Sequence, residues 1–393
     1  MERRKLNKKI VLIALSITIL FTIPLLAIPI TNAADHVGWL DVRPLGSGTA
    51  SYKGVVGGSG QYIYAAQTGS DSYAFMVISI SDPASPTIVG FESRASPGHT
   101  IHCVDVNPAE TVAVVGVSGG IYVIDISDKA NPTRTAYFNF GSSNAAHDVE
   151  IVGDLVYCAA KTTGLPVINI SDINSPTLHW NGDYGDTGTL GLYDIKYDSA
   201  RNVIYGAMSS GYFRVFSLDG NGIPSTQSTI PTSGNRLTAV EKISDYRVAV
   251  GDSYGFVTII NTQNLATPSV LGSVDIGGEI GGIAYTSTLG SYFLAIEDNS
   301  LKLVSFASES APSEAATLTK GSLAGYDVAV TSTYAMAAGG GYGLYIYRIS
   351  DLLGAAAPST GIPGFTFMYI VASILTIGLI IIFTQKSKFF SSL

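Results

Sequence analysis

Short apolar segments rich in β-branched and aromatic residues recur along the middle of the chain. Each is about eight residues long, as in IYVIDISD and FVTIINTQ, which is typical of a buried strand. Seven such segments begin 46, 44, 47, 44, 45 and 43 residues apart, at Phe75, Ile121, Leu165, Tyr212, Phe256, Leu301 and Leu344. This period, filled with short strands, predicts a propeller blade per repeat. We therefore expect an all-β fold, a seven-bladed β-propeller with four-stranded antiparallel blades.

Other features keep step with these segments. Five of the segments are directly preceded by a glycine: Gly120, Gly164, Gly211, Gly255 and Gly343. Glycine suits this position because a tight hairpin needs a positive φ there. Six segments are followed by a proline that suits the edge of an outer strand. Runs such as HCVDV, HDVEI, YDIKY and YDVAV open the units and predict the innermost strand. They place four acids in register: Asp105, Asp148, Asp194 and Asp327.

The last unit lacks its final strand, because Asp351 leads straight into LLGAAAPSTGIPG. A segment before the first unit, VGWLDVR from Val37 to Arg43, has the composition of an outer strand. We expect it to pair with the last blade and close the ring, since closure removes open sheet edges. The propeller then spans residues 35–351, and residues 352–364 form a linker.

The repeated strands resemble the LVIVD repeat, in segments such as YVIDISD and PVINISD followed by a proline. The resemblance covers about residues 37–351, and it is weakest in units five and six. Proteins with this repeat are exported or surface-anchored propellers, so the resemblance implies fold and location and adds little about chemistry.

Both ends of the chain predict export and anchoring. Residues 1–34 have a basic start, an apolar run and small residues, the order of a secretory signal, although the run is long enough to remain as an N-terminal anchor. Residues 365–383 form an uncharged apolar stretch typical of a transmembrane helix. The lysines in residues 384–393 predict a cytoplasmic tail and place the propeller on the extracellular side of the cell membrane. Pro363-Gly364-Phe365 also resembles an archaeal sorting signal, which implies replacement of the helix by a lipid anchor.

Charge argues against nucleic acid as a partner. Between Asp35 and Ser359 the chain holds 29 acidic and 15 basic residues, a formal charge of −14. Phosphate binding requires clustered Lys and Arg, which this region lacks.

Histidines and aspartates near the inner strands are the candidate ligand-binding residues: His102, Asp105, His147, Asp148, Asp194 and Asp327. If they converge at one mouth of the channel, imidazoles and carboxylates could hold a divalent metal or a cationic ligand. The alternative is structural: each Asp caps backbone N–H groups of its own or the next blade. No cofactor is expected from any other motif.

Two cysteines, Cys103 and Cys158, fall in neighbouring units. They could form a disulfide outside the cell, or they could be two separate buried side chains, the arrangement that we favour because a bridge requires close approach of the Cα atoms.

Together these features predict a membrane-anchored extracellular propeller that binds surface proteins or glycans and acts as a scaffolding module. Aromatic residues in the loops suit such partners. The alternative is a metal-dependent or other enzyme that uses the His/Asp cluster at the channel mouth.

Overall fold

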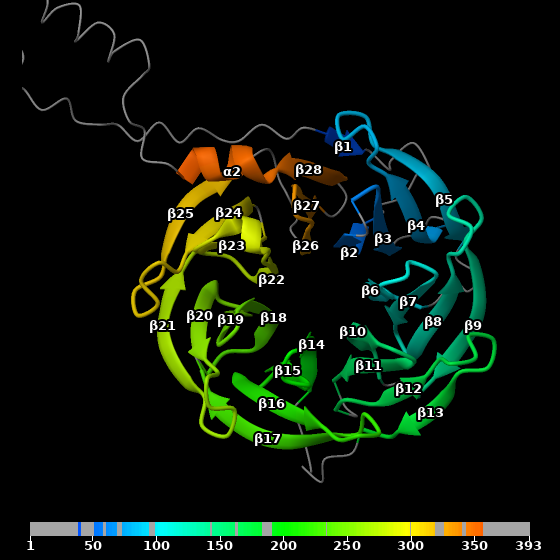
Figure 1. Cartoon of the computed structure of the whole chain (residues 1–393), viewed down its shortest axis with the longest axis horizontal. Helices are drawn as coiled ribbons and strands as arrows, with labels where there is room; N and C mark the ends of the chain where they lie inside the picture. Colours follow the sequence, from blue (N-terminus) through cyan, green and yellow to red (C-terminus); the bar gives the residue numbers. More distant parts are fainter. Residues whose placement is uncertain are drawn as a thin grey trace, which may run out of the picture. The chain divides into compact units, whose positions relative to one another are not determined.

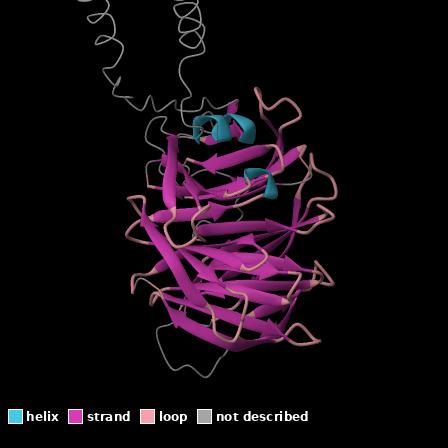
Figure 2. Ribbon diagram, turned by 60° about the vertical axis from the view of Figure 1, so that its left-hand side comes forward, coloured by secondary structure: helices cyan, strands magenta, loops and turns pink. Residues whose placement is uncertain are grey.

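Seven four-stranded antiparallel sheets surround a central axis (Figure 1). The computed structural model describes residues 38–40, 51–57, 60–68, 73–93, 99–141, 144–161, 164–182, 191–232, 234–298, 300–318, 326–339 and 343–356. The architecture confirms the predicted seven-bladed β-propeller. Most of the described structure consists of strands (Figure 2).

Each of blades one to six consists of four consecutive strands, numbered outward from the axis. Blades one to three contain β2 (Ser51–Gly57), β3 (Tyr62–Thr68), β4 (Tyr73–Ser79), β5 (Thr87–Ser93), β6 (Ile101–Val106), β7 (Val112–Val117), β8 (Gly120–Asp125), β9 (Thr133–Asn139), β10 (Ala146–Val152), β11 (Leu155–Ala160), β12 (Val167–Asn169) and β13 (Thr177–Trp180). Blades four to six contain β14 (Leu192–Asp198), β15 (Val203–Met208), β16 (Tyr212–Leu218), β17 (Pro224–Pro231), β18 (Leu237–Ser244), β19 (Arg247–Asp252), β20 (Phe256–Asn261), β21 (Ser269–Asp275), β22 (Ile280–Ala284), β23 (Tyr292–Glu297), β24 (Ser300–Ser305) and β25 (Ser313–Leu318).

Blade seven joins the two ends of the propeller. Its strands β26 (Asp327–Val330), β27 (Tyr334–Ala338) and β28 (Leu344–Arg348) come from the last unit, and its outer strand is β1 (Gly38–Leu40). Trp39 lies opposite Tyr345 in the antiparallel pair β1–β28. The predicted closure by the segment around Val37 to Arg43 is therefore confirmed for residues 38–40.

The apolar core lies between the blades. In the described residues it divides into seven clusters, and each cluster joins two neighbouring blades, including blades seven and one. Continuous burial along the middle strands explains this: Val203–Met208, for example, is buried at every position. A middle strand packs against a different neighbour on each face, so both alternating sets of side chains must be apolar.

Bulges recur at fixed positions in the sheets. In blades one to six the register shifts near the start of the first strand, and it shifts again where the third strand pairs with the outer strand. A bulge bends and twists a strand. The outer bulges therefore make each exposed edge a poor template for pairing with another chain.

A short helix follows the last strand where the sequence predicted a linker. Helix α2 (Ile349–Ala356) buries Ile349 and Leu352 in the cluster between blades six and seven. A single 3-10 turn, η2 (Ser287–Leu289), buries Leu289 in the same cluster. The expected linker thus begins later than residue 352, because Leu352 has an apolar site to fill.

The predicted signal segment, transmembrane span and tail lie outside the described residues. Within the described ranges, no helix combines the length and the apolar character needed to cross a bilayer.

Candidate functional site

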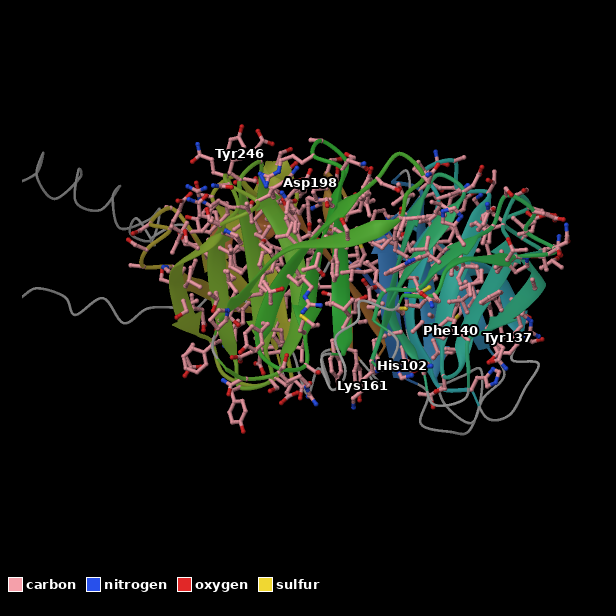
Figure 3. The ribbon with its side chains drawn as sticks, turned by 90° about the horizontal axis from the view of Figure 1, so that it is seen from below. His102, Tyr137, Phe140, Lys161, Asp198 and Tyr246 are labelled. Atoms are coloured by element: carbon pink, nitrogen blue, oxygen red, sulfur yellow. The ribbon has the colours of Figure 1, made fainter. Side chains whose placement is uncertain are left out.

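The two faces of the propeller carry different loops. One face, here called the connection face, carries the blade-to-blade connections and the hairpins between second and third strands; the other is the opposite face. His102, Tyr137, Phe140 and Lys161 lie at the connection face, whereas Asp198 and Tyr246 lie at the opposite face (Figure 3).

In blades one to six, a bulge near the start of the first strand decides which side chains line the channel at the connection face. It inserts one residue, so two successive residues oppose one on the second strand. The bulged residue and its successor are His102 and Cys103 in blade two, His147 and Asp148 in blade three, and Tyr193 and Asp194 in blade four.

The predicted register of the four acids is wrong for blade two. Cys103 occupies the position of Asp148 and Asp194, because each directly follows the bulge. Asp105 stands two residues further along its strand, at the position of Glu150 and Lys196. Two residues is one strand period, so both positions share a face and the sequence pattern alone does not separate them.

The acids bridge neighbouring blades. Asp105 accepts a hydrogen bond from the N–H of Ile151 in the next blade at 2.7 Å, besides one from its own neighbour Val106 at 2.8 Å. Asp194 repeats this with Val240 at 2.5 Å and Ile195 at 3.0 Å. These N–H groups belong to the inner edge of each sheet, which has no further strand to pair with.

Two further acids fit this pattern in part. Asp148 accepts a hydrogen bond from Ile195 of the next blade at 3.1 Å, and Asp327 accepts one from its own neighbour Val328 at 2.8 Å. The structural alternative from the sequence is therefore what the geometry displays: these carboxylates satisfy backbone N–H groups of their own or the next blade.

A second row of charges lies deeper in the channel. The Lys196 ammonium is 3.4 Å from Glu150 of the preceding blade and 3.4 Å from Glu241 of the following blade. These three residues are not among the candidates predicted from the sequence. Their signal was present, because each lies two positions beyond the residue that follows the bulge.

Burial and mutual repulsion shift the pKa values of these groups. Burial raises the pKa of Asp105 to about 8, and the charge of Glu150 adds to the effect. Burial likewise raises the pKa of Asp194 to about 7, against the hydrogen bonds from Asp148 and Val240. The pKa of Asp148 is raised well above its usual range, first by burial and then by the charge of Asp194.

The second row behaves consistently. Burial raises the pKa of Glu241 to about 7, although the charge of Lys196 opposes the rise. The carboxylates of Glu150 and Glu241 raise the pKa of the Lys196 ammonium well above its usual range. Lys196 is therefore charged near neutral pH and holds two blades together through their acids.

The mouth on the connection face is lined by rings. The imidazoles of His102 and His147 lie 4.8 Å apart between centroids, and His147 lies 4.7 Å from the ring of Tyr193. Arg236 and Lys161 stand over Tyr193 at 5.2 and 5.8 Å. Burial, followed by the positive charges of these neighbours, lowers the pKa of His147 to about 4. His147 is therefore neutral near pH 7.

The channel encloses a cavity of about 430 Å³. All six predicted ligand-binding residues line it, together with Glu150, Lys196 and Glu241. The structure thus brings the predicted residues to one cavity, with Asp105 deeper than expected. Nevertheless, in the part of the chain that is described, no three His, Cys, Asp or Glu side chains come together as a metal site would require.

Cys103 and Cys158 are both buried and both free, so the disulfide considered from the sequence is not formed in the structure. They pack in the same apolar cluster between blades two and three. Cys103 instead directs its thiol to the carbonyl oxygen of Ala146 at 3.6 Å. Burial raises the pKa of both thiols, which disfavours the reactive thiolate.

Comparison with known proteins supports the repeat and the fold. Residues 56–91, 109–139 and 144–183 match the LVIVD repeat. No curated protein matches the sequence. A chain in a crystal structure of a mitotic checkpoint complex is similar, with a TM-score of 0.59 and 12% identity over 75% of this chain and 88% of that chain.

The β-propeller domain of Myceliophteria thermophila Cps50 (Swd1) is also similar, with a TM-score of 0.60 and 10% identity over 76% of this chain and 96% of that domain. At such low identity, the likeness extends to the fold alone. The chain is therefore a seven-bladed β-propeller that carries LVIVD repeats.

Proposed function

We propose that this chain is an exported propeller, held at the extracellular side of the cell membrane by its C-terminal apolar segment, that binds other molecules through its connection face. It acts as a protein- or glycan-binding scaffolding module. The sequence of the two ends supports the location, and the distribution of exposed aromatic side chains supports the binding role.

Exposed aromatic residues gather on the connection face. Among the described residues, seven aromatic side chains are exposed. Six of these seven lie at the connection face, in its hairpins and connections or near strand ends beside them: Phe91, Tyr137, Tyr212, Tyr254, Phe256 and Tyr326. Exposed aromatic rings gathered on one face are typical of a recognition surface.

The channel offers less support for the alternative of a metal-dependent or other enzyme. Asp105, Asp148 and Asp194 are engaged by backbone N–H groups of the next blade. Lys196 is engaged by Glu150 and Glu241. These contacts give the channel groups a structural role, whereas Tyr254 on the connection face is 70% exposed and contributes little to the core. Binding at the surface is therefore better supported than chemistry in the channel.

The similar folds agree with this role. One similar propeller was solved within a mitotic checkpoint complex, that is, within an assembly of proteins. Propellers host both binding and catalytic functions, so the fold alone does not choose between them.

Two measurements test the proposal. Protease added to intact source cells should cleave the propeller while cytoplasmic proteins survive, and protection until the cells are opened would refute the location. For binding, the full-length chain should retain material from the cell envelope, and the triple change Tyr212→Ala, Tyr254→Ala and Phe256→Ala should weaken retention at least about tenfold.

A matched control is available on the opposite face. Tyr246 is 48% exposed and lies outside the connection face, so Tyr246→Ala should leave retention unchanged. Equal retention by the triple variant and the unchanged chain would contradict binding through the connection face.

A further inference from the structure

We propose that Tyr212, Tyr254 and Phe256 form a binding platform for an uncharged glycan on blades four and five. These three residues are called the aromatic platform below. The inference rests on the proposed binding function and goes further by naming the site and the chemical class of the partner.

The hairpin that presents two of these rings is held firmly. Tyr254 and Phe256 donate their backbone N–H groups to one carboxylate oxygen of Asp252, at 2.9 and 3.0 Å. The other oxygen of Asp252 accepts a hydrogen bond from the Asn235 side chain at 3.1 Å. Asp252 itself is only 1% exposed. A buried carboxylate thus fixes a hairpin whose tip, Tyr254, is 70% exposed.

A strongly exposed ring on a fixed hairpin backbone requires a reason. Tyr254 is the most exposed large apolar side chain among the described residues. A ring left in water contributes almost no burial free energy to the folded state. Fixing the hairpin backbone beforehand reduces the entropy lost when a partner binds. The hairpin therefore has the properties of a preorganised binding surface.

Tyr212 joins the platform through one connecting segment. It follows Gly211, whose backbone packs against Gly234 and Asn235. Asn235 in turn bonds to Asp252, and the N–H of Ser253 donates to the carbonyl oxygen of Arg236 at 2.9 Å. The segment that links blades four and five thus contacts both the backbone beside Tyr212 and the hairpin that carries Tyr254 and Phe256.

Polar groups separate the rings. Asn235 and Arg236 belong to the segment that contacts both Gly211, next to Tyr212, and the hairpin. Arg236 forms an ion pair with Glu279 at 2.6 Å, and both side chains are about two-fifths exposed. Asp275, exposed at the end of β21, pairs with Phe256 across the sheet. The platform therefore alternates apolar ring faces with hydrogen-bonding groups.

This alternation favours a glycan over a protein. The centre of a protein interface is a continuous apolar area from which charged residues are depleted. A sugar chain instead presents C–H faces that pack on aromatic rings, and hydroxyls that both donate and accept hydrogen bonds. Arg236 compensates the charge of Glu279, and the exposed carboxylate of Asp275 leaves the platform with a net negative charge that disfavours an anionic polysaccharide, so the glycan is uncharged.

The test measures binding of fluorescently labelled oligosaccharides released from the envelope of the source cells. They are separated by anion exchange into a neutral and an acidic fraction, and envelope proteins freed of sugars form a third probe. The full-length chain in detergent should bind the neutral fraction. Tyr254→Ala should weaken that binding about tenfold, the effect of one lost aromatic contact.

Two further variants separate stacking from folding. Tyr254→Phe keeps the ring and should bind within about twofold of the unchanged chain, because stacking does not need the hydroxyl. Tyr246→Ala, on the opposite face, should bind normally.

The remaining outcomes are decisive. Binding of the acidic fraction alone, or of sugar-free protein alone, would overturn the glycan inference and leave the proposed binding function intact. Binding of none of the three probes would overturn both. Equal binding by Tyr254→Ala and the unchanged chain would remove the platform as the site.

Discussion

Single glycines in the hairpins serve two separate purposes. Gly164, Gly211, Gly255 and Gly343 have positive φ, as their place before the third strand predicted. In blade two the positive φ falls on Gly119, and Gly120 already belongs to the strand. A Cβ atom at Gly120 would instead collide with the carbonyl oxygen of Phe138 on the outer strand. The absence of a side chain is thus needed for close approach rather than for backbone conformation.

We expect Gly120→Ala to lower the free energy of unfolding by about 1–3 kcal/mol, because the carbonyl of Phe138 is held in a sheet and cannot easily move away. Gly220→Ala is the matched control. Nothing lies within 4 Å of a Cβ built there, and its φ is not positive. Denaturant unfolding monitored by circular dichroism measures both. A Gly120→Ala chain as stable as the control would refute this account.

At the same scale, the sequence predicted which residues line the channel but not their depths. His102, His147 and three acids were correctly placed near the inner strands. Asp105 was assigned the wrong position because Cys103 stands where the other blades have Asp, and the bulge that fixes the register leaves no mark in a single sequence. Tyr254 was missed for a related reason, since only the hydrogen bonds of Asp252 reveal that its hairpin is rigid.

At the scale of the elements, the inner strands are joined by their own acids over four consecutive blades. Asp105, Asp148 and Asp194 join blades two to five through backbone N–H groups, and Lys196 adds ion pairs between three of them. Blade six has Gly282 and Ala284 at the corresponding positions. The repeated acids thus satisfy backbone N–H groups at the inner sheet edges, which explains why they recur with the period of the blades.

These acids make stability depend on pH in an unusual direction. In the folded chain the pKa is about 8 for Asp105 and about 7 for Asp194 and Glu241, above the ordinary values. The folded state therefore holds more protons than the unfolded state, and the free energy of unfolding should fall as pH rises from about 6.5 to about 8.

Other groups do not reverse this trend in that window. His147 has a pKa of about 4 in the folded chain, below its ordinary value. It therefore increases the free energy of unfolding as pH rises, and this increase is complete near the ordinary histidine pKa of about 6.5, where the window begins. Lys196 stays charged in both states throughout the window. Thermal unfolding of the unchanged chain and of Asp105→Asn/Asp194→Asn across this range tests the argument. The double variant should give a flatter dependence, and an equal slope would contradict it.

At the scale of the whole molecule, the fold was almost fully predictable because the same sequence features recur in every blade. Segment spacing gave the number of blades, and the missing fourth strand of the last unit located the closure. Helix α2 was not predictable from its residues. The segment LLGAAAP has the composition of a linker, and Leu352 is helical and buried because blades six and seven offer it an apolar site.

Closure makes the ring dependent on its first residues. Removal of residues 35–50 deletes β1 and uncovers β28, so the whole propeller should melt at a lower temperature and aggregate more readily. Calorimetry measures the shift in Tm. A synthetic peptide of residues 35–50 should restore part of it when added to the shortened chain. Unchanged melting of the shortened chain would show that β1 contributes nothing to the ring.

The same closure sets how the ring responds to tension. Gly38 pairs with Ile346 and Leu40 with Leu344. The N-terminal end of β1 therefore lies beside the C-terminal end of β28, from which the chain continues to α2. A pull between the two ends of the propeller would therefore load the hydrogen bonds of this pair one after another instead of all together. The other six blades would carry no force until β1 had separated from β28. The three residue pairs of β1 and β28 are therefore the first part of the propeller to break under tension.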